Sequence, residues 1–409
     1  MHRLIFWGII IIVLLVVGLI IDQIFYRIMR LMFDKHAANV IRLSVLIVVI
    51  VSMIITGLCG RYVTRLRVKV SHAELVSSRV PQAFDGFKIA HISDFHLDSF
   101  DKEKEFSFVE KIIDRILAEE PDVICFTGDL VTIRSAQAIP FRNVMSKLSS
   151  TGIPVFSVMG NHDYADYVWD FDDKRRQADR DSLRMIQREA GWQLLDNESR
   201  WLKRGNDSIL IIGVENIGEP PFSVYGDLGK ALHNIQPCGL SSAGEENKTD
   251  DCFAILLSHN PTHWRNEVLP NTNIDLTLSG HTHAMQFRIG SWSPSKWKYP
   301  EFSGLYQEGN QYLNVNTGLG GVGPKIRIGV RPEISIITIH KKKTREKHLT
   351  MHNKQEISTS IYIINKGWKL YAFSLYYCHD SISFCRNDRS IRLVTTEDVA
   401  RIDLVLNIV

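Results

Sequence analysis

The chain has 409 residues, of which 45% are hydrophobic, and its formal net charge is only +3. This length allows one large domain or two ordinary ones, and the hydrophobic fraction suits a globular core together with some membrane. The near balance of charge excludes a general affinity for polyanions, so we expect no nucleic-acid partner. The six cysteines are scattered without a CxxC pair, which predicts buried, reduced thiols rather than a disulfide framework or a zinc knuckle.

Two apolar runs predict a membrane anchor over residues 1–60. Leu4–Ile21 and Leu43–Gly60 are each 18 residues long and uncharged, which just reaches the ~17–25 residues that a spanning helix needs. The first run is too long for a typical signal peptide, and no small-x-small cleavage site follows it. Five basic residues flank the outer ends and four lie in the connecting loop, which leans slightly toward a cytoplasmic catalytic domain.

A basic, then polar, connector is predicted over residues 61–83. The alternation from Tyr62 to Val70 is typical of an amphipathic strand. Its cationic side chains suit either a solvated edge strand, which is the simpler interpretation, or contact with anionic lipid headgroups.

Strands and helices then alternate. Strand-like runs cover residues 87–93, 122–127 and 154–159, and helical periodicity covers Lys104–Glu119 and the stretch around Val144. Strand–helix–strand order predicts right-handed crossovers and parallel pairing. Residues 166–188 form a charged, helical excursion, and residues 220–250 are either a plain connector or a substrate lid. Later strands are expected at 209–214, 253–258, 274–278, 311–316 and 332–339.

Five of these strand-like runs end in Asp, His or Asn. The residues concerned are Asp94, His96, Asp129, Asn161, His259, His281 and His283. Each has an ordinary alternative, such as a helix cap, a turn or a buried core histidine. Together they are too many for one tetrahedral ion, and they suit two ions ~3.5–4 Å apart that share a bridging carboxylate. Ligands of open α/β sheets gather beyond the carboxyl ends of the strands, where all seven residues fall.

The motif order DxH, GD, GNHD, H, GHTH resembles the calcineurin-like metallophosphoesterases. The later segment from Gly318-Leu319-Gly320 to Gly329-Val330-Arg331-Pro332-Glu333-Ile334 is similar to the membrane-associated bacterial branch of that superfamily. The resemblance covers about residues 84–340. It implies a four-layer αββα sandwich, here preceded by two transmembrane helices, and a multi-pass protein of the bacterial inner membrane.

The resemblance also implies a role for each site residue. Asp94, His96 and His283 would hold one metal. Asn161, His259 and His281 would hold the other, and Asp129 would bridge the two. His162 corresponds to the catalytic histidine of the family, with Asp163 orienting it and favouring its imidazolium form.

The implied activity is hydrolysis of a phosphate mono- or diester by metal-activated hydroxide. Mixed His, Asp and Asn ligation suits Mn, Fe or Zn better than Mg. The membrane anchor suggests a lipid-linked phosphate or a nucleotide-diphosphate lipid, although anchoring could also merely localise a general phosphoesterase. The alternative function is a membrane-bound sensor or scaffold that binds phosphate without turnover. Residues 341–409 lie beyond the resemblance and receive no predicted function.

Overall fold

The computed structural model describes residues 2–220, 223–233, 252–342, 361–365, 370–374, 382–387 and 390–395 of the chain. The chain divides into two units, Met1–Thr344 and Arg345–Val409. In the second unit, two antiparallel hairpins are described, β13 (Ile361–Asn365) with β14 (Leu370–Ser374) and β15 (Ile382–Asn387) with β16 (Ser390–Thr395).

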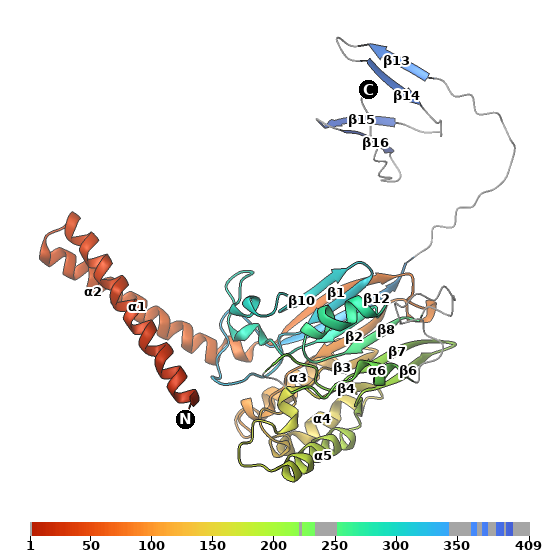
Figure 1. The fold of residues 1–409 in the computed structure, drawn as a ribbon, viewed down its shortest axis with the longest axis horizontal. Helices are drawn as coiled ribbons and strands as arrows, with labels where there is room; N and C mark the ends of the chain where they lie inside the picture. The colour runs from red at the N-terminus through yellow and green to blue at the C-terminus, as the bar shows by residue number, and fades with distance from the viewer. Residues whose placement is uncertain are drawn as a thin grey trace. The chain divides into compact units, whose positions relative to one another are not determined.

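The first unit begins with a pair of long helices, α1 (His2–Met32) and α2 (Lys35–Tyr62) (Figure 1). Asp34 starts α2 because its carboxylate accepts hydrogen bonds from the backbone N–H groups of His36 and Ala37. An Arg42–Asp22 ion pair joins the two helices. The stretch Lys35–Leu66 is long and apolar enough to cross a membrane. The side chains are described from residue 16 onward, and among the described residues this is the one such helix. The first predicted span, Leu4–Ile21, therefore stays a prediction.

Two mixed six-stranded sheets form the centre of the first unit. The first sheet has the order β1 (Lys69–Ser77), β12 (Glu333–Lys341), β2 (Phe87–Ile92), β3 (Val123–Phe126), β4 (Val155–Ser157), β5 (Gln193–Leu194). The second has the order β10 (Gly304–Glu308), β11 (Gln311–Val315), β9 (Leu276–Ser279), β8 (Ala254–Leu257), β7 (Asp207–Gly213), β6 (Glu198–Arg204). Strands β2 to β5 pair in parallel, as do β7, β8, β9 and β11.

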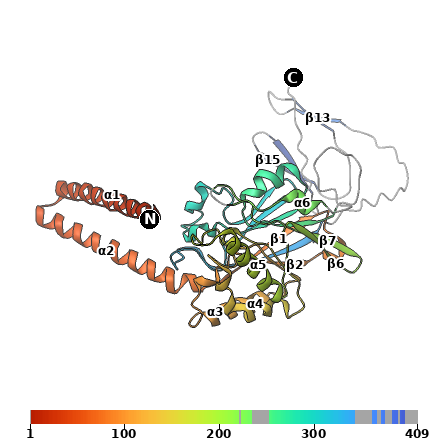
Figure 2. The ribbon, with the colours of Figure 1, turned by 60° about the horizontal axis from the view of Figure 1, so that its bottom comes forward.

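The sheets pack face to face and helices cover their outer faces. Ile89 and Ile255 belong to an apolar core between the sheets, to which both contribute alternate residues. Helices α3 (Phe106–Leu117), α4 (Arg142–Ser149) and α5 (Asp173–Glu189) bury one side against the first sheet, as Ile112 shows. The π-helical turn Trp264–Val268 and α6 (Leu228–Leu232) cover the second sheet (Figure 2). The predicted helix–sheet–sheet–helix layering is therefore present in an α/β fold.

The predicted connector needs a correction. Helix α2 runs on to Tyr62, so the strand expected over Tyr62–Val70 begins only at Lys69. That strand, β1, pairs in parallel with β12 at the edge of the first sheet. Residues 69–77 therefore belong to the catalytic fold, and a domain boundary at residue 84 lies too late. The interpretation of the alternating pattern as an edge strand fits β1.

The cysteines also depart from expectation. Cys125 is a free thiol in the buried strand β3, as predicted, and Cys59 is free near the end of α2. Cys252 is disulfide-bonded, so the expectation of reduced thiols throughout is wrong. Scattered spacing could not reveal this bond because pairing depends on how loops meet in space.

Candidate metal centre

All seven predicted metal ligands come together where the carboxyl ends of strands from both sheets meet. Asp94 follows β2, Asp129 follows β3 and His259 follows β8. Backbone hydrogen bonds join the loops that carry them: Asp94 N donates to Gly128 O at 2.9 Å, and Gly280 N donates to His259 O at 2.9 Å. The sheet packing therefore places the two halves of the site against each other.

Five of the seven ligand residues have left-handed backbone. The φ angles are 49° for Asp94, 40° for His96, 58° for Asp129, 69° for His281 and 49° for His283. Asp and His are among the non-glycine residues that tolerate this region best. Such backbone costs on the order of 1–3 kcal/mol per residue and persists where the surrounding structure determines it. These turns aim the side chains inward immediately after each strand.

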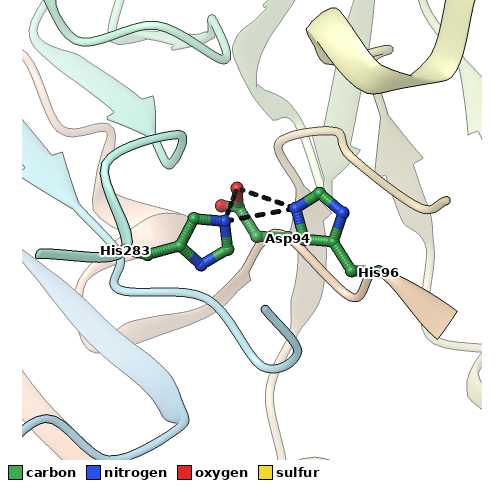
Figure 3. A group of neighbouring side chains, drawn as sticks. All are labelled: Asp94, His96 and His283. Atoms are coloured by element: carbon green, nitrogen blue, oxygen red, sulfur yellow. Dashed lines mark hydrogen bonds and ion pairs between the residues drawn. The ribbon is translucent and has the colours of Figure 1, made fainter. Parts of the chain in front are cut away.

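The first ligand group consists of Asp94, His96 and His283, whose side chains converge in Figure 3. The Nε2 atoms of His96 and His283 lie 3.2 Å apart. Asp94 Oδ1 lies 3.2 Å from His283 Nε2 and 3.8 Å from His96 Nε2. All three side chains are buried.

The second group joins Asn161, His259 and His281. Asn161 Oδ1 lies 3.1 Å from His259 Nε2 and 2.8 Å from His281 Nδ1. Its amide nitrogen donates to Tyr167 Oη at 2.8 Å, which turns the oxygen toward the histidines. The three residues thus offer one oxygen and two nitrogens to one point.

Asp129 lies between the two groups. Its Oδ2 is 3.4 Å from His96 Nε2 and 3.2 Å from His259 Nε2, so one carboxylate reaches a histidine of each group. Its Oδ1 accepts a hydrogen bond from His162 N at 2.8 Å. Asp94 also lies within ligand distance of Asp129 and His259. A carboxylate in this position can reach two metal ions ~3.5–4 Å apart.

The ring nitrogens that face away from the centre have partners of their own. His96 Nδ1 lies 3.1 Å from Thr132 Oγ1, His259 Nδ1 lies 2.7 Å from the Thr127 carbonyl, and His281 Nε2 lies 2.8 Å from Tyr299 Oη. Such outer partners fix the tautomer and the ring direction of metal-bound histidines. Imidazole nitrogens that face one another at 3.2–3.3 Å, beside two buried carboxylates, form a donor set that fits divalent transition metals.

Burial and the close neighbouring charges shift the pKa values of the ligand side chains. Burial would raise the pKa of Asp94, but His283 and His96 beside it hold the pKa of that carboxyl well below its usual range. Burial would likewise lower the pKa of His259, but Asp129 raises it to about 9. Burial, together with His259, lowers the pKa of His281 to about 3. The buried carboxylates and histidines of this centre therefore stabilise one another's charged forms.

His162 lies beside the two ligand groups without directing a ring nitrogen to the centre of either. Its Nδ1 lies 2.7 Å from the Thr132 carbonyl, so Nδ1 carries the proton and Nε2 remains for a substrate. Its ring packs edge-on against His96 and at a tilt against Tyr167. Burial lowers the pKa of His162. His162 is half-buried, whereas His96 and His259 are fully buried.

The expected contact between Asp163 and His162 needs a correction. The Asp163 carboxylate accepts backbone hydrogen bonds from Asp129 N at 2.8 Å, Gly160 N at 2.9 Å and Val131 N at 3.1 Å. Burial and the nearby Asp129 raise its pKa to about 7. Asp163 therefore ties the β3 loop to the β4 loop, and the Thr132 carbonyl orients His162 in its place. Asp163 therefore does not stabilise an imidazolium form of His162, contrary to the prediction.

Several residues around the centre carried no signal in the sequence. Thr132, Tyr167 and Tyr299 contact ligand or catalytic side chains from loops that match no motif. Arg327 is fully buried, and its guanidinium donates to the carbonyls of Thr317, Gly318 and Gly320 while lying 3.5 Å from His283 Nδ1. Only the fold brings these residues to the site.

Most of the two-sheet fold matches a known protein family. Residues 87–285 match the calcineurin-like phosphoesterase family, so the chain contains a domain of that family. The protein is accordingly a metal-dependent hydrolase of phosphoric esters.

Three relatives show how far the similarity extends. An uncharacterized metallophosphoesterase of Bacillus subtilis, YkuE, is 27% identical over 68% of this chain and 88% of its own length. The UDP-2,3-diacylglucosamine pyrophosphatase LpxG of Chlamydia muridarum is 26% identical over 63% of this chain and 86% of its own length. A transmembrane protein with a metallophosphoesterase domain from Bos taurus is 27% identical over 65% of this chain and 56% of its own length.

Proposed function

We propose that this chain is a membrane-anchored two-metal phosphoesterase that hydrolyses a lipid-linked phosphate ester or diphosphate. The observation that carries the proposal is the convergence of seven nitrogen and oxygen ligands on one centre, in a fold whose first edge strand follows directly from an apolar helix. The pyrophosphatase LpxG, whose named substrate carries acyl chains, supports the lipid-linked substrate class.

The ligands divide into two sets. Asp94, His96 and His283 would hold one ion, the second group would hold the other, and Asp129 would reach both. When bound, the ions would neutralise phosphoryl oxygens and supply a nucleophilic water near neutral pH. The donor set fits Mn, Fe or Zn.

The protein side chains then handle the proton and the phosphoryl group. His162, held by the Thr132 carbonyl through its Nδ1–H, presents Nε2 to the substrate. Once Nε2 has taken up a proton, it can donate that proton to a phosphoryl oxygen or to the leaving group. Asp163 keeps the two loops that carry Asp129 and His162 in register. Tyr167 lies beside the His162 ring and limits its movement.

The proposed location is a bacterial inner membrane, with α1 and α2 as two spans. The apolarity of α2 and the transmembrane relative support membrane attachment. The side of the catalytic domain has opposing indications. Basic residues lean slightly toward the cytoplasm, whereas the disulfide-bonded Cys252 is typical of an oxidising compartment.

The function is tested with full-length protein in detergent or nanodiscs. Chelation should abolish hydrolysis of bis(4-nitrophenyl) phosphate, and Mn, Fe or Zn should restore it. Hydrolysis rates of UDP-2,3-diacylglucosamine and of a phospholipid are then measured, to compare a nucleotide-diphosphate lipid with a lipid phosphate ester. Full turnover in excess chelator would contradict the two-metal proposal. Retained metal and phosphate binding without turnover of any ester would instead identify a sensor or scaffold.

The role of the shared carboxylate is tested by metal content. We expect Asp129→Ala to lose more metal than His96→Ala or His259→Ala, because Asp129 reaches a histidine of each group. Metal analysis of the three purified variants measures this. Two ions per chain in Asp129→Ala would show that another group, such as Asp94, joins the ions.

A further inference from the structure

A segment that follows the last metal ligand exposes large apolar side chains to solvent. The exposed fractions are 53% for Met285, 65% for Ile289, 40% for Trp292 and 81% for Trp297. We call these four residues the aromatic surface. Indole and aliphatic groups exposed together in this way are a signature of an interaction surface rather than of an ordinary protein exterior.

The aromatic surface is held in shape by its own backbone. Ile289 and Trp292 exchange two backbone hydrogen bonds, with N–O distances of 2.9 and 3.0 Å. The hydroxyl of Ser293 donates to Ala284 O at 2.7 Å, and Ser293 caps the short helix Pro294–Trp297. The Trp292 and Trp297 rings then meet edge to face at 5.7 Å between centroids. The surface is thus presented by a closed, buttressed loop.

This loop lies against the segment that holds the end of the candidate membrane span. Arg288 N donates to Ile328 O, and Ile328 N donates to Gln286 O, both at 2.9 Å. The same segment reaches α2, because Arg327 N donates to Gly60 O at 3.2 Å. In Figures 1 and 2 the teal loops before β10 lie beside the catalytic-domain end of α2. The loop that carries the aromatic surface is therefore linked to the end of the apolar helix by backbone hydrogen bonds through Arg327 and Ile328.

The charge of this region is one-sided. The stretch Met285–Lys298 contains Arg288, Lys296 and Lys298 and no acidic residue. Arg61, at the end of α2, adds a further cation. Tryptophan with lysine and arginine beside a spanning helix is the composition of a membrane–water interface. Cations near a surface of anionic lipid each contribute on the order of 1 kcal/mol to attraction.

We propose that the aromatic surface inserts into the headgroup layer of an anionic bilayer beside α2. Indole and aliphatic side chains enter among the lipids while Arg288, Lys296 and Lys298 meet their phosphates. The aromatic surface begins two residues after His283, so the inserted segment is close in the chain to a predicted metal ligand. This placement rests on the membrane anchoring by α2 in the proposed function, but it does not depend on turnover.

Tryptophan quenching in lipid nanodiscs tests the insertion. Full-length protein is placed in nanodiscs of phosphatidylglycerol and a phosphatidylcholine brominated near the headgroup, which quenches indoles at that depth. We expect the quenched intensity to fall in Trp292→Phe/Trp297→Phe relative to the parent. Trp201→Phe is the matched control, because exposed Trp201 lies on β6, at the opposite edge of the second sheet from β10. It should leave the quenched intensity unchanged.

Two outcomes would overturn the proposal. One is an equal quenched intensity in the parent and the double variant, which would place both indoles in water. The other is concentration-dependent dimerisation that the double variant abolishes without any bromolipid quenching, which would assign the surface to a second copy of the chain. Failure of the proposed function would be seen separately, as absent ester hydrolysis with the quenching difference preserved.

Discussion

The four ligand histidines do not present the same nitrogen to the metal centre. His96, His259 and His283 face it with Nε2, whereas His281 faces it with Nδ1 because its Nε2 lies against Tyr299 Oη. Two histidines one residue apart can therefore serve different ions. A GHTH motif alone does not reveal this division, since the tautomer depends on a partner 18 residues further along the chain.

Tyr299→Phe tests this partner. The ring stays packed edge-on against His281, but the hydrogen bond to Nε2 is lost. We expect metal affinity at the second group to fall ~10–100-fold, the usual effect of removing such a partner. The metal affinity is measured by titrating the metal-free protein with metal while following activity and bound metal. Tyr306→Phe is the control, because its hydroxyl accepts only from backbone N–H groups of Phe302 and Ser303. An equal loss in both variants would contradict the assignment.

His162→Ala should lose turnover and keep its metals. His162 N donates to Asp129, but its ring packs edge-on against His96 and directs Nδ1 to the Thr132 carbonyl rather than to the centre of either ligand group. A general acid or phosphoryl contact of this kind contributes ~10²–10⁴ in rate. The loss should be larger for alkyl esters, which need a protonated leaving group, than for nitrophenyl esters. Equal losses would indicate phosphoryl binding alone, and loss of metal would make His162 a ligand.

At the scale of elements, the strands that lead into the predicted ligands could be predicted from the sequence, whereas the edge strands of the second sheet could not. Strands β2, β3 and β8 are buried on both faces, so their continuous apolar runs are clear and stop where a polar ligand begins. Strands β6 and β10 have mostly exposed, polar residues and no comparable pattern. The seven predicted ligand side chains lie together for the same reason, whereas Tyr299 and Arg327 come from loops whose proximity exists only in the folded chain.

Gly280→Ala tests how closely the strand ends approach each other. A Cβ at this position would lie 2.0 Å from Ser93 Oγ and 2.2 Å from Asp94 Oδ2, so Asp94 must move. We expect loss of metal together with a destabilisation of about 1–3 kcal/mol, the usual cost of overpacking. Thermal unfolding and metal analysis measure both. Gly229→Ala in α6 is the control, since its Cβ would meet nothing closer than 3.3 Å. Normal metal content in Gly280→Ala would be contrary to this packing.

At the scale of the molecule, one residue contacts both the apolar helix α2 and the candidate metal centre. Arg327 donates its backbone N–H to Gly60 at the end of α2, and its guanidinium braces Thr317 and Gly318 beside His283. Arg65, just after α2, pairs with Glu105 and donates to Ser99 O at 3.4 Å. The end of the apolar helix is thereby built into the catalytic domain.

Deletion of residues 1–66 should therefore weaken the metal centre. It removes Gly60 and Arg65, and with them the contacts that hold Arg327 and Glu105. We expect a lower melting temperature and faster loss of metal to a chelator than in the full chain. Deletion of residues 1–32 removes α1 but spares these contacts, so it should leave both properties unchanged in detergent. Identical behaviour of the two deletions would show that the junction contributes nothing.

The junction between helix and sheet has a further consequence for substrate choice. Only Arg67 and Val68 separate the short helical turn Thr64–Leu66 from β1, so the catalytic domain is not on a tether that could sweep the membrane surface. The metal centre would stand at a fixed height above the lipid. It would therefore select substrates by the distance between the membrane and the scissile phosphate. Among synthetic lipids with spacers of increasing length before the scissile phosphate, the full chain should prefer one length. Equal rates across the series would mean that height is not selected.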